Sequence, residues 1–431
     1  MDQKLLLPTP EQVEWANCEI GVIIHLDLVI YQAPYDIREH FEDPIPPSVF
    51  DPQKLSTDGW CEAAKALGAK YAVLVAKHGT GFSLWPTEAH DYSVKNTPYQ
   101  NGEGDIVRDF IASCKKYGLR PGIYCSASTS QLLNVEYPGR VRDGDPVKQE
   151  RYNQILMQQL TELWTNYGDL FEIWFDGGVI PVEEGGPDVA RLLQKLQPNA
   201  VVFQGPVGTR SLIRWVGNER GVAPEDCSSL FSSDAGNADG LTEQTDMCVG
   251  EEIWCPAESD LPNRYAHKSY LGGWLWREGE DCTVLTGEEI FERYLTSVGR
   301  NTNMLVGMVI NTDGEFPAHD RAQFARAGEL IREAFGDPIA EGEEGAHTVL
   351  IPQNGERKPR YLVLREDIAE GERVTAYTVR AYAQDGATVF RHEGKVIGHK
   401  RILAIPCDSV RCEVVPTAYR AEPRLLPLLV Y

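Results

Sequence analysis

The sequence predicts an α/β fold: a (β/α)8-type barrel, with allowance for irregularity, followed by a C-terminal antiparallel β-sandwich. Over residues 1–340, short apolar runs alternate with amphipathic helical patterns, which is typical of a parallel sheet. Beyond an acidic, glycine-bearing linker, residues 346–431 contain only short β-rich segments separated by turns, which indicates a sandwich. We therefore expect a barrel domain over 1–340 and a sandwich domain over 346–431.

Each element of the barrel has its own signal. Asp105 is placed to cap the start of a helix, while Gly68 and Gly118 are placed to end helices. Apolar, strand-like runs are predicted at 20–25, 71–75, 119–125, 170–176, 199–204 and 304–310. Helical patterns are predicted around 60–67, 106–117, 155–164 and 288–298, with a polar insertion at 223–246. Sandwich strands are predicted at 348–351, 360–364, 373–380, 388–392 and 400–405.

Composition and charge narrow the classes of partner. The chain has 431 residues, 42% of them hydrophobic and 24% charged, which is ordinary for a globular protein. Its net charge of −23 repels phosphate backbones and anionic bilayers, so neither nucleic acid nor a membrane is expected as a partner. No apolar stretch approaches the ~20 residues of a membrane span. If Met1 is the native start we expect a cytoplasmic protein, and a periplasmic or secreted one if a signal peptide has been removed.

No cofactor or metal is predicted. The chain has ten cysteines, none of them in a Cys-x-x-Cys pair, and no His-Glu-x-x-His sequence. A nucleophile elbow of the form Gly-x-Ser-x-Gly and a phosphate-binding glycine loop are also missing. The oligomeric state is left open by the sequence.

Asp176 is the first candidate for a catalytic residue. It ends the apolar run 170–176 and is followed directly by Gly177 and Gly178, which must break the strand. In a parallel barrel, the carboxyl end of a strand is the rim that carries catalytic side chains. The alternative is a structural role, in which the aspartate accepts hydrogen bonds from the amides of the turn.

Three further polar residues lie at or just after predicted strands: His25, His78 and Glu219. A lone histidine at such a position is more often structural, but convergence of several on one rim indicates a site. Several tryptophans lie near these segments, and aromatic faces pack against sugar rings. These tryptophans are Trp85, Trp174, Trp215, Trp254, Trp274 and Trp276. Two rim carboxylates with aromatic neighbours favour glycoside hydrolysis.

Motifs along nearly the whole chain resemble glycoside hydrolase family 29, the retaining α-L-fucosidases. The resemblance rests on the order and spacing of these segments more than on any one of them. The segments are 21–25 (Gly-Val-Ile-Ile-His), 69–78, 81–86, 91–94, 104–107, 118–124, 174–178 (Trp-Phe-Asp-Gly-Gly), 215–219 (Trp-Val-Gly-Asn-Glu) and 397–402.

The resemblance implies roles for individual residues. It makes Asp176 the nucleophile and Glu219 the acid/base, in a form similar to the branch that cleaves α-1,3/1,4-linked fucose from branched glycans. His25 and His78 would bind sugar hydroxyls, Trp174 would line the sugar site, and Tyr124 would border the same pocket. Trp85 and Trp215 are further candidates for substrate binding because aromatic faces pack against sugars. An oligosaccharide or glycoconjugate is therefore the expected partner.

Two alternatives stay open. Glu258 competes with Glu219 for the acid/base role, although with Asp260 and Arg264 it is better suited to holding the sugar beyond the scissile bond. The chain also departs from the family where a second histidine and an aspartate are usual, because Gly79 and Thr80 stand there, and the opening His25-Leu26-Asp27 lacks the usual aromatic and glycine. Related functions are the same machinery on an α-L-galactoside, or a glycan-binding relative without turnover.

Overall fold

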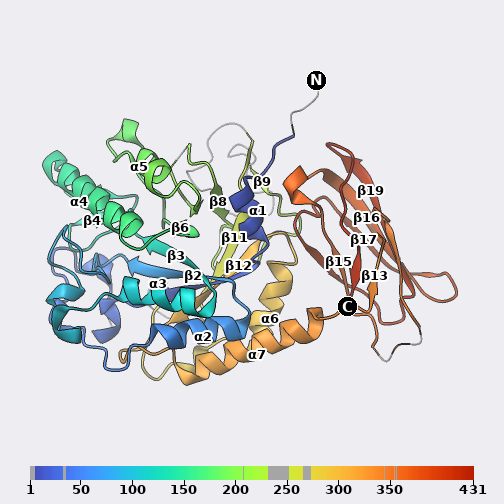
Figure 1. The fold of residues 1–431 in the computed structure, drawn as a ribbon, viewed down its shortest axis with the longest axis horizontal. Helices are drawn as coiled ribbons and strands as arrows, with labels where there is room; N and C mark the ends of the chain where they lie inside the picture. The colour runs from blue at the N-terminus through green and yellow to red at the C-terminus, as the bar shows by residue number, and fades with distance from the viewer. Residues whose placement is uncertain are drawn as a thin grey trace.

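The computed structural model describes residues 5–32, 35–206, 208–231, 252–265, 273–343, 345–353, 355 and 357–431. A closed barrel of parallel strands occupies the first part of the chain, in the order β1-β12-β11-β8-β7-β6-β3-β2 (Figure 1). Its strands are β1 (Ile20–His25), β2 (Tyr71–Lys77), β3 (Arg120–Cys125), β6 (Glu172–Trp174), β7 (Val201–Phe203), β8 (Leu212–Trp215), β11 (Ala257–Leu261) and β12 (Asn303–Val309). The pairing of β1 with β12 closes the ring.

Helices surround the barrel, and one closes its amino end. The outer helices are α2 (Thr57–Leu67), α3 (Ile106–Tyr117), α4 (Pro146–Thr165), α5 (Val189–Leu196), α6 (Gly287–Thr296) and α7 (Ala318–Phe335). Helix α1 (Pro10–Ala16) lies across the start of the strands, where Gln12 donates to the carbonyl of Leu212 and Asn303 donates to that of Trp15. The predicted caps are confirmed: Asp105 accepts from the Arg108 amide, and Gly68 and Gly118 end their helices in the left-handed conformation.

Two antiparallel sheets follow the barrel. One is β13 (Ala340–Glu341), β20 (Leu429–Val430), β15 (Tyr361–Leu364) and β18 (Arg401–Ala404); the other is β14 (Thr348–Leu350), β19 (Arg411–Tyr419), β16 (Val374–Tyr382) and β17 (Thr388–Gly394). Figure 1 shows them beside the barrel, on the side away from α4 and α5. The predicted fold class is confirmed. No helix within the described ranges has the length and apolar character needed to cross a bilayer.

Smaller elements fill the connections. The short strand pairs are β4 (Val135–Glu136) with β5 (Arg140–Val141), and β9 (Leu230–Phe231) with β10 (Ile253–Trp254). The 3-10 helices are η1 (Leu28–Tyr31), η2 (Ile37–Glu39), η3 (Pro47–Val49), η4 (Val94–Asn96), η5 (Tyr99–Gly102), η6 (Val182–Glu184), η7 (Asp281–Thr283) and η8 (Ile368–Glu370).

Two barrel strands, β8 and β11, were not among the predicted strands. Strand β11 has the sequence Ala-Glu-Ser-Asp-Leu, yet all five residues are buried. Its polar side chains are paired inside the fold: the Ser259 hydroxyl lies 2.9 Å from that of Thr302. Hydrophobic periodicity cannot identify a strand of this kind. Of the predicted polar insertion at 223–246, the part from 232 onward lies outside the described residues.

Glycines inside the barrel make room for large neighbours. A Cβ at Gly21 would overlap the Tyr71 ring, and one at Gly307 would lie 2.8 Å from the Trp274 ring. A Cβ at Gly122 would meet the Glu172 backbone oxygen at 3.0 Å. These β1, β12 and β3 positions therefore admit the side chains that fill the barrel beneath the rim.

We predict that Gly21→Ala destabilises the fold by about 1–3 kcal/mol, because the methyl group overpacks a buried site against Tyr71. Urea unfolding followed by circular dichroism measures the change. Gly59→Ala in α2 is the matched control: its Cβ meets only Ser56, at 3.4 Å, so a helical alanine there should be neutral or stabilising. Equal stability of the Gly21 variant and the wild type would contradict the prediction.

Candidate active site at the carboxyl rim of the barrel

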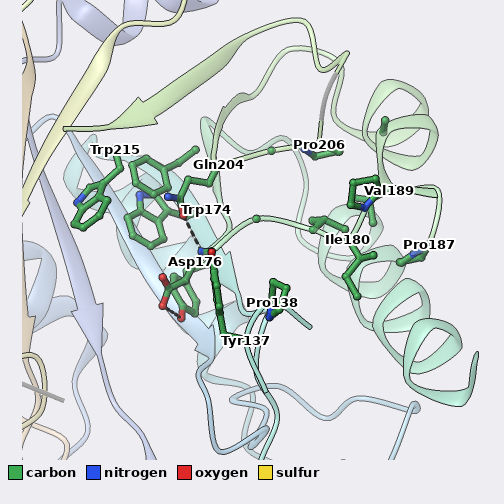
Figure 2. A pocket seen from close by; sticks show the side chains of 18 of the residues that line it. Tyr137, Pro138, Trp174, Asp176, Ile180, Pro187, Val189, Gln204, Pro206 and Trp215 are labelled. Atoms are coloured by element: carbon green, nitrogen blue, oxygen red, sulfur yellow. Dashed lines mark hydrogen bonds between the residues drawn. The ribbon is translucent and has the colours of Figure 1, made fainter. Parts of the chain in front are cut away.

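A cavity of about 1110 Å³ opens at the carboxyl ends of the barrel strands. Aromatic and acidic side chains from the strand ends line its floor. The segment 177–190, with residues from 137–140, forms the opposite wall, which is mostly apolar and also carries Arg140, Glu183, Glu184 and Asp188; it is called the apolar wall below (Figure 2). The floor residues are His25, His78, Tyr124, Trp174, Asp176, Phe203, Gln204, Trp215, Glu219, Asp260 and Trp274.

Asp176 lies two residues beyond β6 and is exposed to the cavity. The Tyr124 hydroxyl donates to its Oδ2 at 3.0 Å, and the Ser128 hydroxyl donates to its backbone carbonyl. The amide of the next residue, Gly177, donates to Gln204 Oε1 at 2.7 Å. Figure 2 shows the bonds to Tyr124 and Gln204, with the Asp176 carboxylate between Trp215 and the Tyr137 side of the cavity. Asp176 is thus oriented by side chains but open to a ligand.

Glu219 follows β8 and faces the same cavity. Although the side chain is exposed, the surrounding protein removes part of its hydration, and this desolvation raises its pKa. The negative charge of Asp176 raises the pKa further, while a hydrogen bond with Trp274 opposes the shift. The structure therefore places two carboxyl groups near each other in one cavity, and Glu219 keeps its proton to higher pH than a free glutamate does.

Histidines and stacked rings form the floor beside Asp176. The His25 and His78 ring centroids lie 5.8 Å apart, and His78 stacks on Tyr124 at the same spacing. Tyr124 stacks on Trp174 at 5.4 Å, and Trp174 lies almost parallel to Phe203 at 3.9 Å. Burial, with a smaller contribution from the charge of His78, lowers the pKa of His25 to about 3. His25 is therefore a neutral imidazole, which can both donate to and accept from a hydroxyl group.

Trp215 and Asp260 meet on the side of the cavity opposite the apolar wall. The Trp215 indole donates to Asp260 Oδ1 at 2.7 Å. Burial and then the nearby Glu219 charge raise the pKa of Asp260 well above its usual range. Asp260 is thus a cavity residue with little tendency to carry charge.

Three predicted site residues lie outside the cavity lining. Glu258 is fully buried below the floor, bound by Tyr71 and Trp174. Trp85 is in the core, where its indole donates to Glu162 at 2.9 Å. Arg264 is buried in a two-point bond with Asp320, with distances of 3.1 and 2.9 Å. These geometries do not place Trp85 or Arg264 at a sugar.

The positions that depart from the family pattern pack against one another. The Thr80 hydroxyl donates to Asp27 Oδ2 at 2.7 Å, and both residues are buried. A Cβ at Gly79 would lie 2.7 Å from the Ile37 side chain of η2. Neither Gly79 nor Thr80 lines the cavity. Thr80 and Asp27 are therefore paired with each other, Gly79 packs against Ile37, and these positions lie away from the cavity lining.

Several cavity residues were missed by sequence reasoning. Gln204 follows β7 directly, so its strand-end position was an available signal, and its backbone has φ of +49°. Phe203 is the last residue of β7. The wall residues carry no such signal: Tyr137 and Pro138 belong to the β4–β5 connection, Ile180 to a loop, and Val182 to the short 3-10 helix η6. In the part of the chain that the structure describes, no group of three or more His, Cys, Asp or Glu side chains is placed to hold a metal ion.

Comparison with known proteins identifies the family. The model of the α-L-fucosidase family matches residues 29–334. The chain belongs to the α-L-fucosidase family. α-L-fucosidase 1 of Arabidopsis thaliana is 30% identical over 99% of this chain and 88% of its own length. As a retaining α-L-fucosidase, the protein hydrolyses terminal fucosides.

Solved structures agree with this assignment. A Bacteroides thetaiotaomicron protein assigned as an α-L-fucosidase superposes with a TM-score of 0.88 at 32% identity, covering 99% of each chain. A glycoside hydrolase 29 family member from a rumen bacterium gives 0.80 at 26% identity, over 99% of this chain and 77% of its own. The match to the α-L-fucosidase family model extends from η1 almost to the end of α7, so it spans nearly the whole barrel and its rim.

Proposed function

We propose that Asp176 is the nucleophile and Glu219 the acid/base of this α-L-fucosidase. The observation that carries the proposal is that the two carboxyl groups face one cavity from the loops after β6 and β8, where desolvation, with a smaller contribution from the charge of Asp176, raises the pKa of Glu219. A retaining glycosidase needs one ionised carboxylate and one carboxylic acid in such a pair.

The chemistry runs in two steps. Asp176 attacks the anomeric carbon while Glu219 gives its proton to the glycosidic oxygen, so the leaving group departs as an alcohol and a glycosyl ester forms. Glu219, now ionised, takes a proton from water, and the water oxygen displaces Asp176 from the anomeric carbon. The Tyr124 hydroxyl donates to Asp176 Oδ2 at 3.0 Å and orients that carboxylate for attack.

Burial favours Glu219 over Glu258 as the acid/base. Glu258 is 0% exposed and both of its oxygens accept hydrogen bonds inside the barrel, whereas Glu219 opens to the cavity. A proton donor must come within hydrogen-bond reach of the leaving oxygen. Glu219 meets that requirement without rearrangement of the floor.

The substrate we propose is fucose linked α-1,3 or α-1,4 to a branched glycan. The sequence Gly217-Asn218-Glu219 supports this branch of the family, and the cavity is far larger than one sugar. Its wall includes Tyr137 and Val182, which are 62% and 57% exposed, and a bound leaving group would cover them. In this proposal residues 1–340 carry catalysis and 346–431 support the barrel.

Replacing Asp176 with Ala should lower kcat by at least ~10⁴-fold, because the covalent step is lost, while circular dichroism stays that of the wild type. Azide should restore part of the activity by entering the vacated space. Proton NMR of the first-formed sugar from the wild type should show the α-anomer. Inversion, or an active Asp176→Ala enzyme, would remove Asp176 from this role.

With substrates that have poor leaving groups, the Glu219→Ala variant should lose ~10²–10⁴-fold in kcat/KM. With nitrophenyl fucoside, whose leaving group needs little protonation, the loss should be much smaller. The acid form of Glu219 is required and its pKa is raised, so wild-type kcat/KM should fall as pH rises through that value. This alkaline limb should vanish in the variant with nitrophenyl fucoside. Glu183→Ala, which removes a wall carboxylate, is the control and should keep both properties.

Linkage preference is tested with a panel of fucosides. Branched trisaccharides containing α-1,3- or α-1,4-linked fucose should be hydrolysed with kcat/KM at least about tenfold above α-1,2- and α-1,6-linked disaccharides, which corresponds to ~1.4 kcal/mol of transition-state binding. An α-L-galactoside with the same leaving group serves as the sugar control. Preference for α-1,2 linkage would contradict the branch assignment but leave the fucosidase activity intact.

A further inference from the structure

Two carboxyl groups lie together inside the barrel, beneath the cavity floor. Glu172 on β6 and Glu258 on β11 are both 0% exposed, and their carboxyl groups are close enough to interact directly. Among the described residues, no Lys, Arg or His forms an ion pair with either carboxyl group. Two adjacent buried negative charges without a cation are strongly unfavourable, so the pair must hold a proton.

The hydrogen bonds locate that proton. Both Glu258 oxygens accept: Oε1 from the Tyr71 hydroxyl at 2.6 Å and Oε2 from the Trp174 indole at 2.9 Å. On Glu172, Oε2 accepts from the Trp15 indole at 3.2 Å, while Oε1 is buried and has no donor. The acceptor-only pattern suits a carboxylate at Glu258. The oxygen without a donor suits the hydroxyl of a carboxylic acid at Glu172.

The groups around the pair leave it no other source of charge balance. Tyr71 on β2 and Trp174 on β6 donate hydrogen bonds to Glu258. The Trp15 indole of α1 donates to Glu172, and the Cys18 thiol, just beyond α1, lies nearby. On β12, Asn303 adjoins Tyr71, and on β11 the nearby Asp260 adds only negative charge. Burial followed by Glu258 raises the pKa of Glu172 well above its usual range, and burial raises that of Glu258 to about 7.

We propose that Glu172 and Glu258 share one proton, carried by Glu172, and that this acid–carboxylate pair is a positioning unit for the active site. The pair fixes the position of the Trp174 ring, because the Trp174 indole N–H donates to Glu258. Trp174 stacks on Tyr124, and the Tyr124 hydroxyl donates to Asp176. The pair thus acts on the nucleophile through two side chains and touches no substrate. The inference rests on the proposed catalytic role of Asp176.

Glutamine substitutions test which residue carries the proton. In Glu172→Gln the amide can still donate to Glu258 and accept from Trp15, so it should recover most of the kcat/KM that Glu172→Ala loses. Glu258 accepts from three donors: Tyr71, Trp174 and the proposed acid at Glu172. In Glu258→Gln the single amide oxygen can accept from only two of them and the NH₂ group faces the third donor, so kcat/KM should fall about 10- to 100-fold. A tolerated Glu258→Gln with a damaged Glu172→Gln would overturn the assignment.

Unfolding equilibria provide a readout that needs no activity. Unfolded Glu172 releases its proton near the usual value of 4.5, whereas the folded protein keeps it to higher pH. The folded state therefore binds the extra proton above pH 4.5, and wild-type stability should fall as pH rises through that window. Relative to Glu172→Gln, which lacks this proton, the wild-type unfolding constant should rise by up to about tenfold per pH unit. A difference independent of pH would refute the shared proton.

A double-mutant cycle separates positioning from general damage to the fold. Trp174→Phe removes the indole donor, so Glu258→Gln should cost less in kcat/KM in that background than in the wild type. Additive losses would show that Glu258 does not act through Trp174. If Glu258→Gln does not fold, the pH dependence of Glu172→Gln still decides. Should fucosidase activity fail altogether, the unfolding experiment still reports on the pair while the proposed function falls.

Discussion

Closure of the barrel is the constraint on which the rest of the structure depends. The last barrel strand, β12, pairs with the whole length of the first, β1, from Ile20 opposite Met304 to His25 opposite Val309. Because all eight strands are parallel, their carboxyl ends meet at one rim, and side chains as distant as His25 and Trp274 share a cavity. The same closure excludes water from the interior, so any polar group placed there must find its partner across the barrel.

That second consequence explains where sequence reasoning stopped. Strands with continuous apolar runs, such as β1, β2 and β12, were predicted because such a composition indicates a strand buried on both faces. Strand β11 is buried just as completely but carries Glu258, Ser259 and Asp260, and β8 carries a buried Arg214. Their stability comes from partners on other strands, which no local pattern records. Polar barrel strands are therefore visible only when the whole ring is assembled.

The sequence was sufficient to select several residues of the site, but not to predict how deep in the barrel each side chain lies. Strand-end position was enough to select Asp176, which the structure places at the rim. Glu258 and Asp260 point to the same side of β11, yet only Asp260 reaches the cavity, because two residues along a strand correspond to ~6.6 Å of depth. Arg264 lies beyond β11, where its guanidinium turns back to Asp320 on α7. Spacing in a sequence does not distinguish a rim position from one a single layer below.

The apolar wall of the cavity is built from a part of the chain separate from the barrel strands. It is supplied largely by one continuous stretch, 177–190, inserted between β6 and α5, with proline at 181 and 187. Figure 2 shows this stretch standing apart from Trp174 and Trp215 across the cavity. Its anchors are Gly177, held by Gln204, and the start of α5, capped by Asp188. Because both ends of this stretch are anchored, changes of sequence or length between the anchors can reshape one side of the cavity without displacing Asp176 or the barrel strands.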